Sequence, residues 1–403
     1  MEHQEKKVPN LRFKGFTNDW EQRKLGELFK ERAEKSGSGQ LLSVSISQGV
    51  SPFDESIRKN NSSKDKHNYK VVKINDIAYN SMRMWQGAEG IATVQGIVSP
   101  AYTVIIPNSN ANPLFFESLF KTSKMLYVFR SHSQGLTSDT WNLKYPLLKK
   151  IYVNVPKIHE QEKIANLIRK TEALISLQQR KLDLLKQLKK GMLQKMFADK
   201  GSKRPILRFE GFNDDWEGRK LENSADYIRG SFPQPYGNKE WYGGTNAKPF
   251  VQVVDVNTNM RLNKKTKEQI SVLAQPKSRF VPSDSIVVTL QGSIGRVAIT
   301  QYDSYVDRTL LIFTKYKVPV DKYFWAYSIQ NIFRIEKQKA PGGTIKTITK
   351  RALSSFEVNL PVQEEQKKIG TLLKNIDDII TSQQEEVSKL KKIKKSLLQQ
   401  MFI

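Results

Sequence analysis

Residues 11–25 read LRFKGFTNDWEQRKL, and residues 207–221 read LRFEGFNDDWEGRKL. Eleven of these 15 positions are identical, at an offset of 196 residues, and we call the two stretches the opening motifs. A second repeat relates residues 155–197 to residues 360–402, where 17 of 43 positions are identical at an offset of 205. A period near 200 residues is far too long for a stack of small repeats. The sequence therefore indicates a tandem duplication of a whole domain.

Each copy consists of an opening motif, a divergent domain and a long helix. A chain of 403 residues suits two domains of ordinary size. The polar stretch ADKGSKRP at residues 198–205 joins the two copies. The boundaries that we predict are a first domain over residues 1–155, a central helical spacer over 156–200, a second domain over 201–360 and a C-terminal helical spacer over 361–403.

The two domains share a skeleton of α and β segments. Asn112 and Asp321 are suitable N-caps for helices that we predict over residues 114–130 and 323–337. The predicted strands cover residues 102–106, 285–290 and 309–314. A strand with alternating apolar residues ends each domain, at Ile151, Val153 and Val155 in the first and at Phe356, Val358 and Leu360 in the second. These patterns predict an α+β fold with two mixed α/β domains.

Both long helices carry a seam of residues at alternating spacings of four and three. The seam of the first is Ile164, Ile168, Thr171, Ile175, Gln178, Leu182, Leu185, Lys189, Met192 and Met196, and that of the second is Ile369, Leu373, Ile376, Ile380, Gln383, Val387, Leu390, Lys394, Leu397 and Met401. This heptad spacing predicts that the helices supercoil around one another. If a pseudo-twofold axis relates the domains, the helices form an antiparallel coiled coil. At ~1.5 Å per residue each helix spans roughly 55 Å, so we expect it to act as a ruler.

The charge of the chain indicates its partners. Lysine and arginine outnumber aspartate and glutamate by 66 to 40, a formal net charge of +26. This excess favours nucleic acid, ahead of an anionic membrane or an acidic protein. Five lysines within residues 389–395 form either a solvated helix face or a surface that follows phosphates. The absence of cysteine, of an apolar leader and of any apolar run near ~20 residues leads us to expect a cytoplasmic protein without a membrane partner.

The doubled arrangement resembles the specificity (S) subunit of Type I restriction–modification systems. Four repeated features carry the resemblance: LRFxGFxxxW at residues 11–20 and 207–216, PxxxEQxKI at 156–164 and 361–369, the Gln-Gln pairs at 178–179 and 383–384, and LxxMF at 193–197 and 398–402. Residues 76–90 and 96–100 also look like target-recognition sequence of that family. The resemblance covers essentially the whole chain.

The resemblance implies a particular division of labour. Two target-recognition domains, separated by helical spacers, would each read one half of a bipartite, asymmetric DNA site. The subunit itself would be a non-catalytic, DNA-binding component of a DNA methylation and restriction complex. Its partners would be double-stranded DNA, two modification subunits that methylate adenine, and restriction subunits that add translocation and cleavage. S-adenosylmethionine, ATP and Mg²⁺ would then be cofactors of the partner subunits, with none in this chain.

The residues themselves favour no catalytic or metal site in this chain. The sequence lacks a GxxxxGK[ST] phosphate loop and an NPP[FY] motif. The four histidines are scattered without ligand spacing. Adjacent carboxylates occur at 214–215, 364–365 and 377–378, where we favour structural roles. We therefore predict that the protein is not an enzyme.

Base reading needs side chains such as Arg, Lys, Asn and Gln that reach base edges. Residues 80–87, 131–141, 289–296 and 339–347 combine such side chains with glycine turns, which let a loop approach a groove closely. The candidate DNA-contacting residues are Asn80, Arg83, Trp85, Gln86, Ser133 and Gln134 in the first domain and Thr289, Gln291, Ser293, Arg296, Thr344 and Lys346 in the second. The alternative is that these are ordinary turns, with Met82 and Trp85 buried.

Two other functions remain open from the sequence. One is a DNA nuclease or methyltransferase with a duplicated binding region, which activity of the chain alone with S-adenosylmethionine or Mg²⁺ would reveal. The other is a coiled-coil nucleic-acid-binding scaffold acting on RNA or acidic proteins, which competition between duplex DNA and RNA would reveal.

Overall fold

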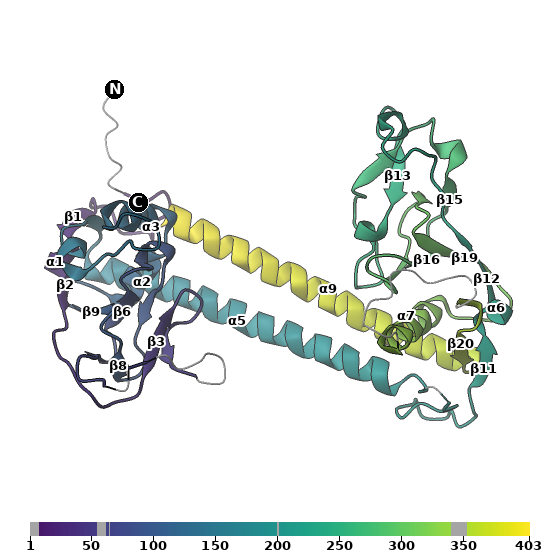
Figure 1. Cartoon of the computed structure of the whole chain (residues 1–403), viewed down its shortest axis with the longest axis horizontal. Coiled ribbons are helices and arrows are strands. Elements are labelled where there is room, and N and C mark those ends of the chain that lie inside the picture. Colours follow the sequence, from purple (N-terminus) through teal and green to yellow (C-terminus); the bar gives the residue numbers. More distant parts are fainter. Residues whose placement is uncertain (1–7, 55–61, 64, 200, 340–352) are drawn as a thin grey trace. The chain divides into compact units, whose positions relative to one another are not determined.

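The computed structural model describes residues 8–54, 62–63, 65–199, 201–339 and 353–403. The chain divides into two compact units, which we call unit one (residues 1–178 and 386–403) and unit two (residues 179–385). Each unit combines one globular domain with the first part of the long helix that follows it and the last part of the other long helix (Figure 1). The two long helices, α5 (Ile158–Lys195) and α9 (Gln363–Gln400), therefore each contribute to both units.

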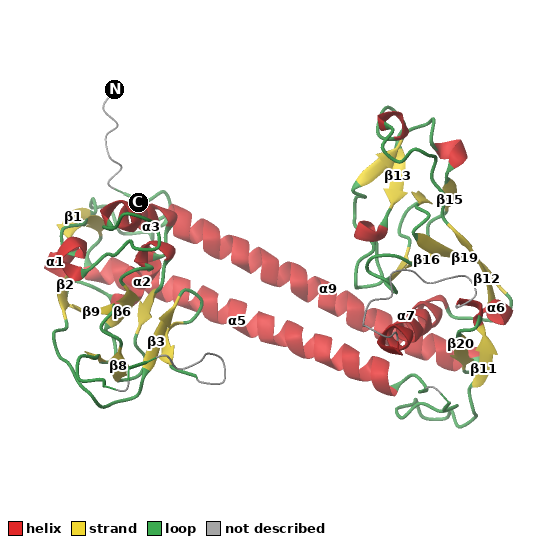
Figure 2. Cartoon of the chain, in the orientation of Figure 1, coloured by secondary structure: helices red, strands yellow, loops and turns green. Residues whose placement is uncertain are grey.

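Unit one is a mixed α and β domain (Figure 2). Its elements ahead of α5 are β1 (Glu21–Lys24), α1 (Leu25–Leu28), β2 (Phe29–Glu31), β3 (Leu42–Ser45), β4 (Gly49–Pro52), β5 (Lys70–Val72), β6 (Ile77–Asn80), η1 (Met84–Gln86), β7 (Glu89–Ile91), β8 (Gly96–Val98), β9 (Tyr102–Pro107), α2 (Pro113–Phe120), α3 (Ser123–His132), α4 (Tyr145–Leu148) and β10 (Tyr152–Val155). A four-stranded antiparallel sheet in the order β2-β9-β6-β7 forms its centre, and β3-β4 and β5-β8 pair beside it.

Unit two repeats this plan with a larger second sheet. Its elements are β11 (Glu217–Lys220), α6 (Leu221–Ser224), β12 (Ala225–Arg229), η2 (Lys239–Trp241), β13 (Lys248–Val251), η3 (Val253–Asp255), β14 (Glu268–Ile270), η4 (Gln275–Lys277), β15 (Arg279–Val281), β16 (Ile286–Thr289), β17 (Val297–Ile299), β18 (Ser304–Val306), β19 (Leu310–Tyr316), α7 (Lys322–Lys339) and β20 (Glu357–Leu360). The order β12-β19-β16-β17 reproduces the central sheet of unit one, while β14-β13-β18-β15 forms a second sheet. The duplication inferred from the ends of each copy therefore extends to the divergent middle.

The predicted strands and N-caps are confirmed, and one predicted helix is wrong. The strands predicted over residues 102–106, 285–290 and 309–314 are β9, β16 and β19. Asn112 and Asp321 both accept a hydrogen bond from the backbone N–H three residues later. The helix predicted over residues 114–130 is instead two helices, because the Thr122 side chain caps a new start at α3. In unit two, α7 continues without this break.

Each opening motif pairs with the last strand of its domain and binds the start of a long helix. β1 pairs antiparallel with β10, and β11 pairs in the same way with β20, so the alternating final strands are confirmed. Arg12 donates two hydrogen bonds to the buried Glu160 carboxylate, at 2.7 and 2.8 Å. Arg208 repeats this contact with Glu365, at 2.7 and 2.9 Å. Both glutamates come from the repeated Glu-Gln pair, so this part of the repeat has a structural role.

The glutamine of that pair has an equally specific structural role. Gln161 accepts a hydrogen bond from the Asn112 N–H and donates to the carbonyl oxygens of Asn110 and Pro156. Gln366 makes the matching contacts with the backbone of residues 319, 321 and 361. One amide side chain thus joins the end of the last strand to the start of the domain's main helix.

The two long helices pair antiparallel in each unit. In unit one the backbone N–H of Leu11 donates to the carbonyl oxygen of Gln400, and in unit two that of Leu207 donates to Lys195. Each opening motif therefore meets the end of the helix from the other copy. Every described residue of the two predicted seams is buried or half-buried, whereas off-seam Leu177 and Leu184 are exposed, which confirms the heptad pattern. Within the described helices, none is long and apolar enough to cross a bilayer.

Equivalent lysines in the two seams form ion pairs with equivalent carboxylates. Lys189 lies 2.6 Å from Asp377 in unit two, and Lys394 lies 2.7 Å from Glu172 in unit one. Since Glu172 and Asp377 differ by 205 residues, as do the lysines, the same ion pair occurs twice. The two lysines therefore interrupt the apolar seams as charges that are paired, and the structural role expected for Asp377 is confirmed.

Candidate nucleic-acid interface

Of the four candidate residues at 80–86, Asn80 ends β6 and the other three lie on the connection between β6 and β7. The Asn80 side chain accepts from the Met82 N–H at 3.0 Å, which shapes the turn. Arg83 donates to Gln86 Oε1 at 3.1 Å, so the two polar side chains are held together. Trp85 is half-buried and donates through its indole N–H to the Met82 carbonyl at 3.1 Å. Arg83 is exposed, and this turn therefore presents a guanidinium beside an amide.

The second candidate stretch of unit one is brought to the same place. The Trp85 and Trp141 rings meet edge to face with centroids 5.3 Å apart. The backbone N–H of Leu143 donates to the Ser81 carbonyl at 2.8 Å. Two backbone hydrogen bonds join Gln134 to Asn142, which closes the loop between them. The Gln134 side chain is exposed, whereas the Ser133 hydroxyl donates to the Phe129 carbonyl at 2.7 Å and serves the end of α3.

Two further residues belong to this surface: Trp141, which ends the candidate stretch 131–141 but was not a candidate residue, and Arg130, which sequence reasoning missed. Trp141 is half-buried against Trp85, and the Arg130 guanidinium lies 5.2 Å from the centroid of its ring. A guanidinium stacked on an aromatic ring is held in place without losing its charge. Arg130 lies in the last turn of α3. Only the fold brings it near the β6–β7 turn, so no local pattern in the sequence marks it.

Unit two places four of its six candidate residues at the equivalent turn, between β16 and β17. Gln291, Ser293 and Arg296 are half-buried there. Gly292 and Gly295 have φ of +65° and +80°, which side chains disfavour, so the tight turn expected from their spacing is confirmed. Arg296 donates to the Val256 carbonyl at 3.3 Å through one of its two terminal nitrogens.

Thr289 does not fit its predicted role. The side chain is fully buried, and its hydroxyl donates to the Ser293 carbonyl at 2.5 Å and accepts from the Arg296 N–H at 3.0 Å. It therefore shapes the turn from inside and exposes no surface to DNA. The remaining candidates, Thr344 and Lys346, lie outside the described residues.

A buried carboxylate lies directly behind the β6–β7 turn. Glu89 is fully buried, and Lys121 Nζ is 3.6 Å from its carboxylate. Burial raises the pKa of Glu89 to about 8, and Lys121 opposes that rise only in part. Glu89 therefore holds its proton near neutral pH. In unit two the position is apolar, because β17 begins with Val297 there.

Unit two also contains a polar cavity of about 300 Å³ between its central sheet and α9. Asn259, Arg261, Lys374, Asp377 and Asp378 are among its lining residues. Arg261 and Lys374 both contact Asp378, so the charges in the cavity are paired with one another. Across the described part of the chain, no group of three or more His, Cys, Asp or Glu residues is arranged to hold a metal ion.

Comparison with known proteins identifies a family match over most of the chain. The family described as "Type I restriction modification DNA specificity domain" matches twice, over residues 17–187 and 213–392. The putative type I restriction enzyme MjaX specificity subunit of Methanocaldococcus jannaschii is 27% identical over 305 residues, which cover 72% of this chain and 68% of that protein. The MjaVIII specificity subunit of the same organism is 24% identical over 357 residues, covering 81% and 78%.

Solved structures show the same fold at low sequence identity. The crystal structure of a Type I restriction-modification system S subunit from M. genitalium has a TM-score of 0.62 at 13% identity, covering 98% of this chain and 99% of that one. A second structure, described as the structural basis of complex assembly and conformational transition of the type I R-M system, has a TM-score of 0.52 at 18% identity and covers 94% and 96%.

Proposed function

Since the chain belongs to the Type I restriction–modification DNA specificity family, we propose that each of its two domains reads one half of a bipartite, asymmetric DNA sequence. The observation that carries the proposal is the pair of equivalent turns. β6–β7 and β16–β17 connect matching strands of matching sheets, yet one presents Arg83 and Gln86 and the other Gln291 and Arg296. Two domains that read different DNA sequences require the same scaffold with different polar side chains on its turns.

The proposal assigns catalysis to partner subunits. The chain contributes recognition, while modification subunits methylate adenine with S-adenosylmethionine and restriction subunits use ATP and Mg²⁺. The family membership and the formal charge of +26 support double-stranded DNA as the ligand. The family match also favours this function over a stand-alone nuclease or methyltransferase and over an RNA-binding scaffold. We propose a cytoplasmic location on the same grounds.

The two long helices support a second part of the proposal, that they set the gap between the half-sites and dock the modification subunits. Both helices are 38 residues long, and the seam residues of each are buried or half-buried. On α5 the off-seam side chains of Leu174, Leu177, Leu184 and Leu188 are exposed. A row of exposed leucines on a helix is suited to burial against another protein.

A domain exchange tests the proposal. We would replace residues 20–150 with the corresponding residues of a relative of different specificity and co-express the chimera with its modification subunits. The expected outcome is a hybrid methylated sequence, with only the half-site of the first domain changed. Genome-wide mapping of adenine methylation, with and without the chain, measures it. An unchanged methylated sequence in the chimera would refute the assignment.

A further inference from the structure

A polar hairpin in unit two, residues 256–263, contacts both the candidate turn and α9. An antiparallel bridge between Val256 and Leu262 closes it, and the Asn257 N–H donates to the Arg261 carbonyl at 2.9 Å. Its main anchor on α9 is Asp378, and the repeat places Ala173 at the corresponding position of α5. The contact with Asp378 is therefore not one of the features that the duplication kept in both copies.

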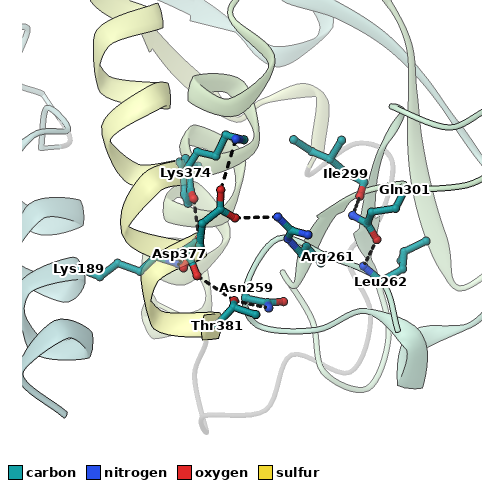
Figure 3. Close-up of polar contacts among 11 residues, drawn as sticks. Lys189, Asn259, Arg261, Leu262, Ile299, Gln301, Lys374, Asp377 and Thr381 are labelled. Atoms are coloured by element: carbon teal, nitrogen blue, oxygen red, sulfur yellow. Dashed lines mark hydrogen bonds and ion pairs between the residues drawn. The ribbon is translucent and has the colours of Figure 1, made fainter. Parts of the chain in front are cut away.

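Two side chains attach the hairpin to α9. Arg261 Nη2 donates to Asp378 Oδ1 at 2.7 Å, and Lys374 holds the other oxygen of that carboxylate at 3.3 Å (Figure 3). Asn259 Nδ2 donates to Thr381 Oγ1 at 3.1 Å. These contacts lie one helical turn apart on the same face of α9, so they fix the hairpin against rotation as well as translation.

Three further contacts attach the hairpin to the central sheet and its turn. Arg296, in the β16–β17 turn, donates to the Val256 carbonyl at 3.3 Å. The Ile299 N–H donates to the Met260 carbonyl at 3.0 Å. The Leu262 N–H donates to Gln301 Oε1 at 2.9 Å, as Figure 3 shows. The hairpin therefore contacts β17 at Ile299 and the residues that flank this strand, Arg296 and Gln301.

The backbone at the tip of the hairpin is held in an unfavourable shape. Met260 has φ of +59°, a region that a long side chain rarely adopts, and its side chain is 97% buried in the core. Such a conformation persists only where the surroundings impose it. The core packing of Met260 and the anchors on α9 together impose it here, so the hairpin is not a freely moving loop.

The anchor on α9 continues into the contact between the two long helices. Thr381 Oγ1, which accepts from Asn259, donates to the backbone carbonyl of Asp377 at 2.8 Å. The Asp377 carboxylate binds Lys189 of α5 and accepts from Tyr327 at 2.5 Å. Hydrogen bonds and ion pairs, joined through the hairpin, therefore connect the β16–β17 turn to the contact between α5 and α9.

We propose that this hairpin is a brace that positions the β16–β17 turn on α9, and that Arg261 is its positioning residue. The turn is a reader of DNA only if the proposed function holds, whereas the brace itself is a mechanical property of the free chain. The two parts are therefore tested by separate measurements.

Amide hydrogen exchange on the full-length chain without DNA tests the brace. In Arg261→Ala we expect the amides of Gly295 and Arg296 to exchange about fivefold faster, since a charge-assisted anchor is lost. Asp378→Ala should do the same, and it introduces the residue that α5 carries naturally, in a helix that tolerates alanine well. The combination of Arg261→Asp with Asp378→Arg should restore slow exchange.

Lys264→Ala is the matched control. Lys264 lies just beyond the hairpin and faces Glu385 of α9 at 3.5 Å, but its side chain is 97% exposed. Removing this cation should leave exchange in the turn unchanged. If Arg261→Ala and Asp378→Ala accelerate exchange only within residues 256–263, or nowhere, the brace is refuted.

Methylation mapping then tests the link to reading. In the complete complex, Arg261→Ala should relax base preference in the half-site of the second domain and leave the first unchanged, with rescue by the charge-swapped pair. A merely structural defect would instead lower methylation at all sites without changing the preferred bases, and that result would overturn the positioning role. Loss of the proposed function alone would leave the exchange result intact.

Discussion

Arg12 and Arg208 each bind a glutamate at the start of a long helix through two hydrogen bonds, and in both cases the carboxylate is buried. Lys163 and Lys368 then lie over the rings of Phe16 and Phe212, again one pair in each copy. These residues are repeated between the copies, and their contacts stabilise the scaffold. The residues that could distinguish one DNA sequence from another belong to the divergent set.

Arg83 and Arg296 should each affect one half-site only. Replacing Arg83 with alanine should relax base preference in the half-site of the first domain by about 1–3 kcal/mol, the usual worth of a bidentate base contact. Arg296→Ala should relax the other half-site by a similar amount. The measurement is the methylated sequence of each variant complex. A uniform loss of affinity with unchanged preference would instead make these arginines phosphate contacts.

Glu89 should make the stability of the chain depend on pH. Its pKa is raised to about 8 in the folded state by burial, against about 4.5 unfolded. The folded state therefore holds the proton more tightly, and the stabilisation present below pH 4.5 is lost as pH rises through 8. Glu89→Gln mimics the neutral form, so above pH 8 it should be more stable than the parent, by on the order of 5 kcal/mol. Urea unfolding at pH 6 and pH 8.5 measures this.

The half-buried Glu117 provides the control for Glu89. It contacts the same lysine at 2.8 Å, and its side chain is 26% exposed. Glu117→Gln should leave the pH dependence in place. Parallel pH profiles for the parent and Glu89→Gln would show that Glu89 is already ionised in the fold.

Among the elements, the helix pair depends on opposite charges that only an antiparallel arrangement brings together. In a parallel pairing aligned by the repeat, Lys189 would face Lys394, and like charges would repel. In the observed pairing each lysine faces a carboxylate. The two pairs differ in burial, because Lys189 and Asp377 are 12% and 7% exposed whereas Lys394 and Glu172 are 33% and 48% exposed.

This difference in burial predicts unequal costs for equivalent mutations. Lys189→Met should destabilise the chain by about 3–5 kcal/mol, because it leaves the buried Asp377 carboxylate without its cation. Lys394→Met should cost no more than about 1 kcal/mol, since that pair is largely hydrated. Urea unfolding compares them, and reversing the buried pair with Lys189→Asp and Asp377→Lys should recover much of the loss. Equal costs for the two methionine variants would contradict this account.

For the molecule as a whole, the proposed ruler predicts an effect of helix length on the DNA site. Seven residues inserted after Gln178 and seven after Gln383 would preserve the heptad seam and lengthen both helices by ~10.5 Å. At ~3.4 Å per base pair, the gap in the methylated sequence should grow by about three base pairs. Methylation mapping reads the gap directly. An unchanged gap in a chain that still methylates DNA would exclude the ruler.

The predictions from sequence succeeded where the signal is local or repeated, and failed where packing decides. The heptad seams and β9, β16 and β19 follow from side-chain periodicity, which burial of one face imposes directly. The break between α2 and α3 was missed because Thr122 is compatible with a helix interior until tertiary contacts select it as a cap. Thr289 was misassigned because an exposed and a buried threonine look alike in a turn.

By itself the sequence determined that the protein is a duplicated domain with two long helices, that the helices pair through a heptad seam, and which segments carry the divergent polar side chains. Repetition and periodicity along the chain encode all three. Only the tertiary structure decided that the β6–β7 and β16–β17 turns are equivalent, that Arg130 and Trp141 join the first of them, and that residues 256–263 connect the second to α9. Contacts between residues far apart in the chain depend on the three-dimensional path of the backbone, and no local pattern of side chains records that path.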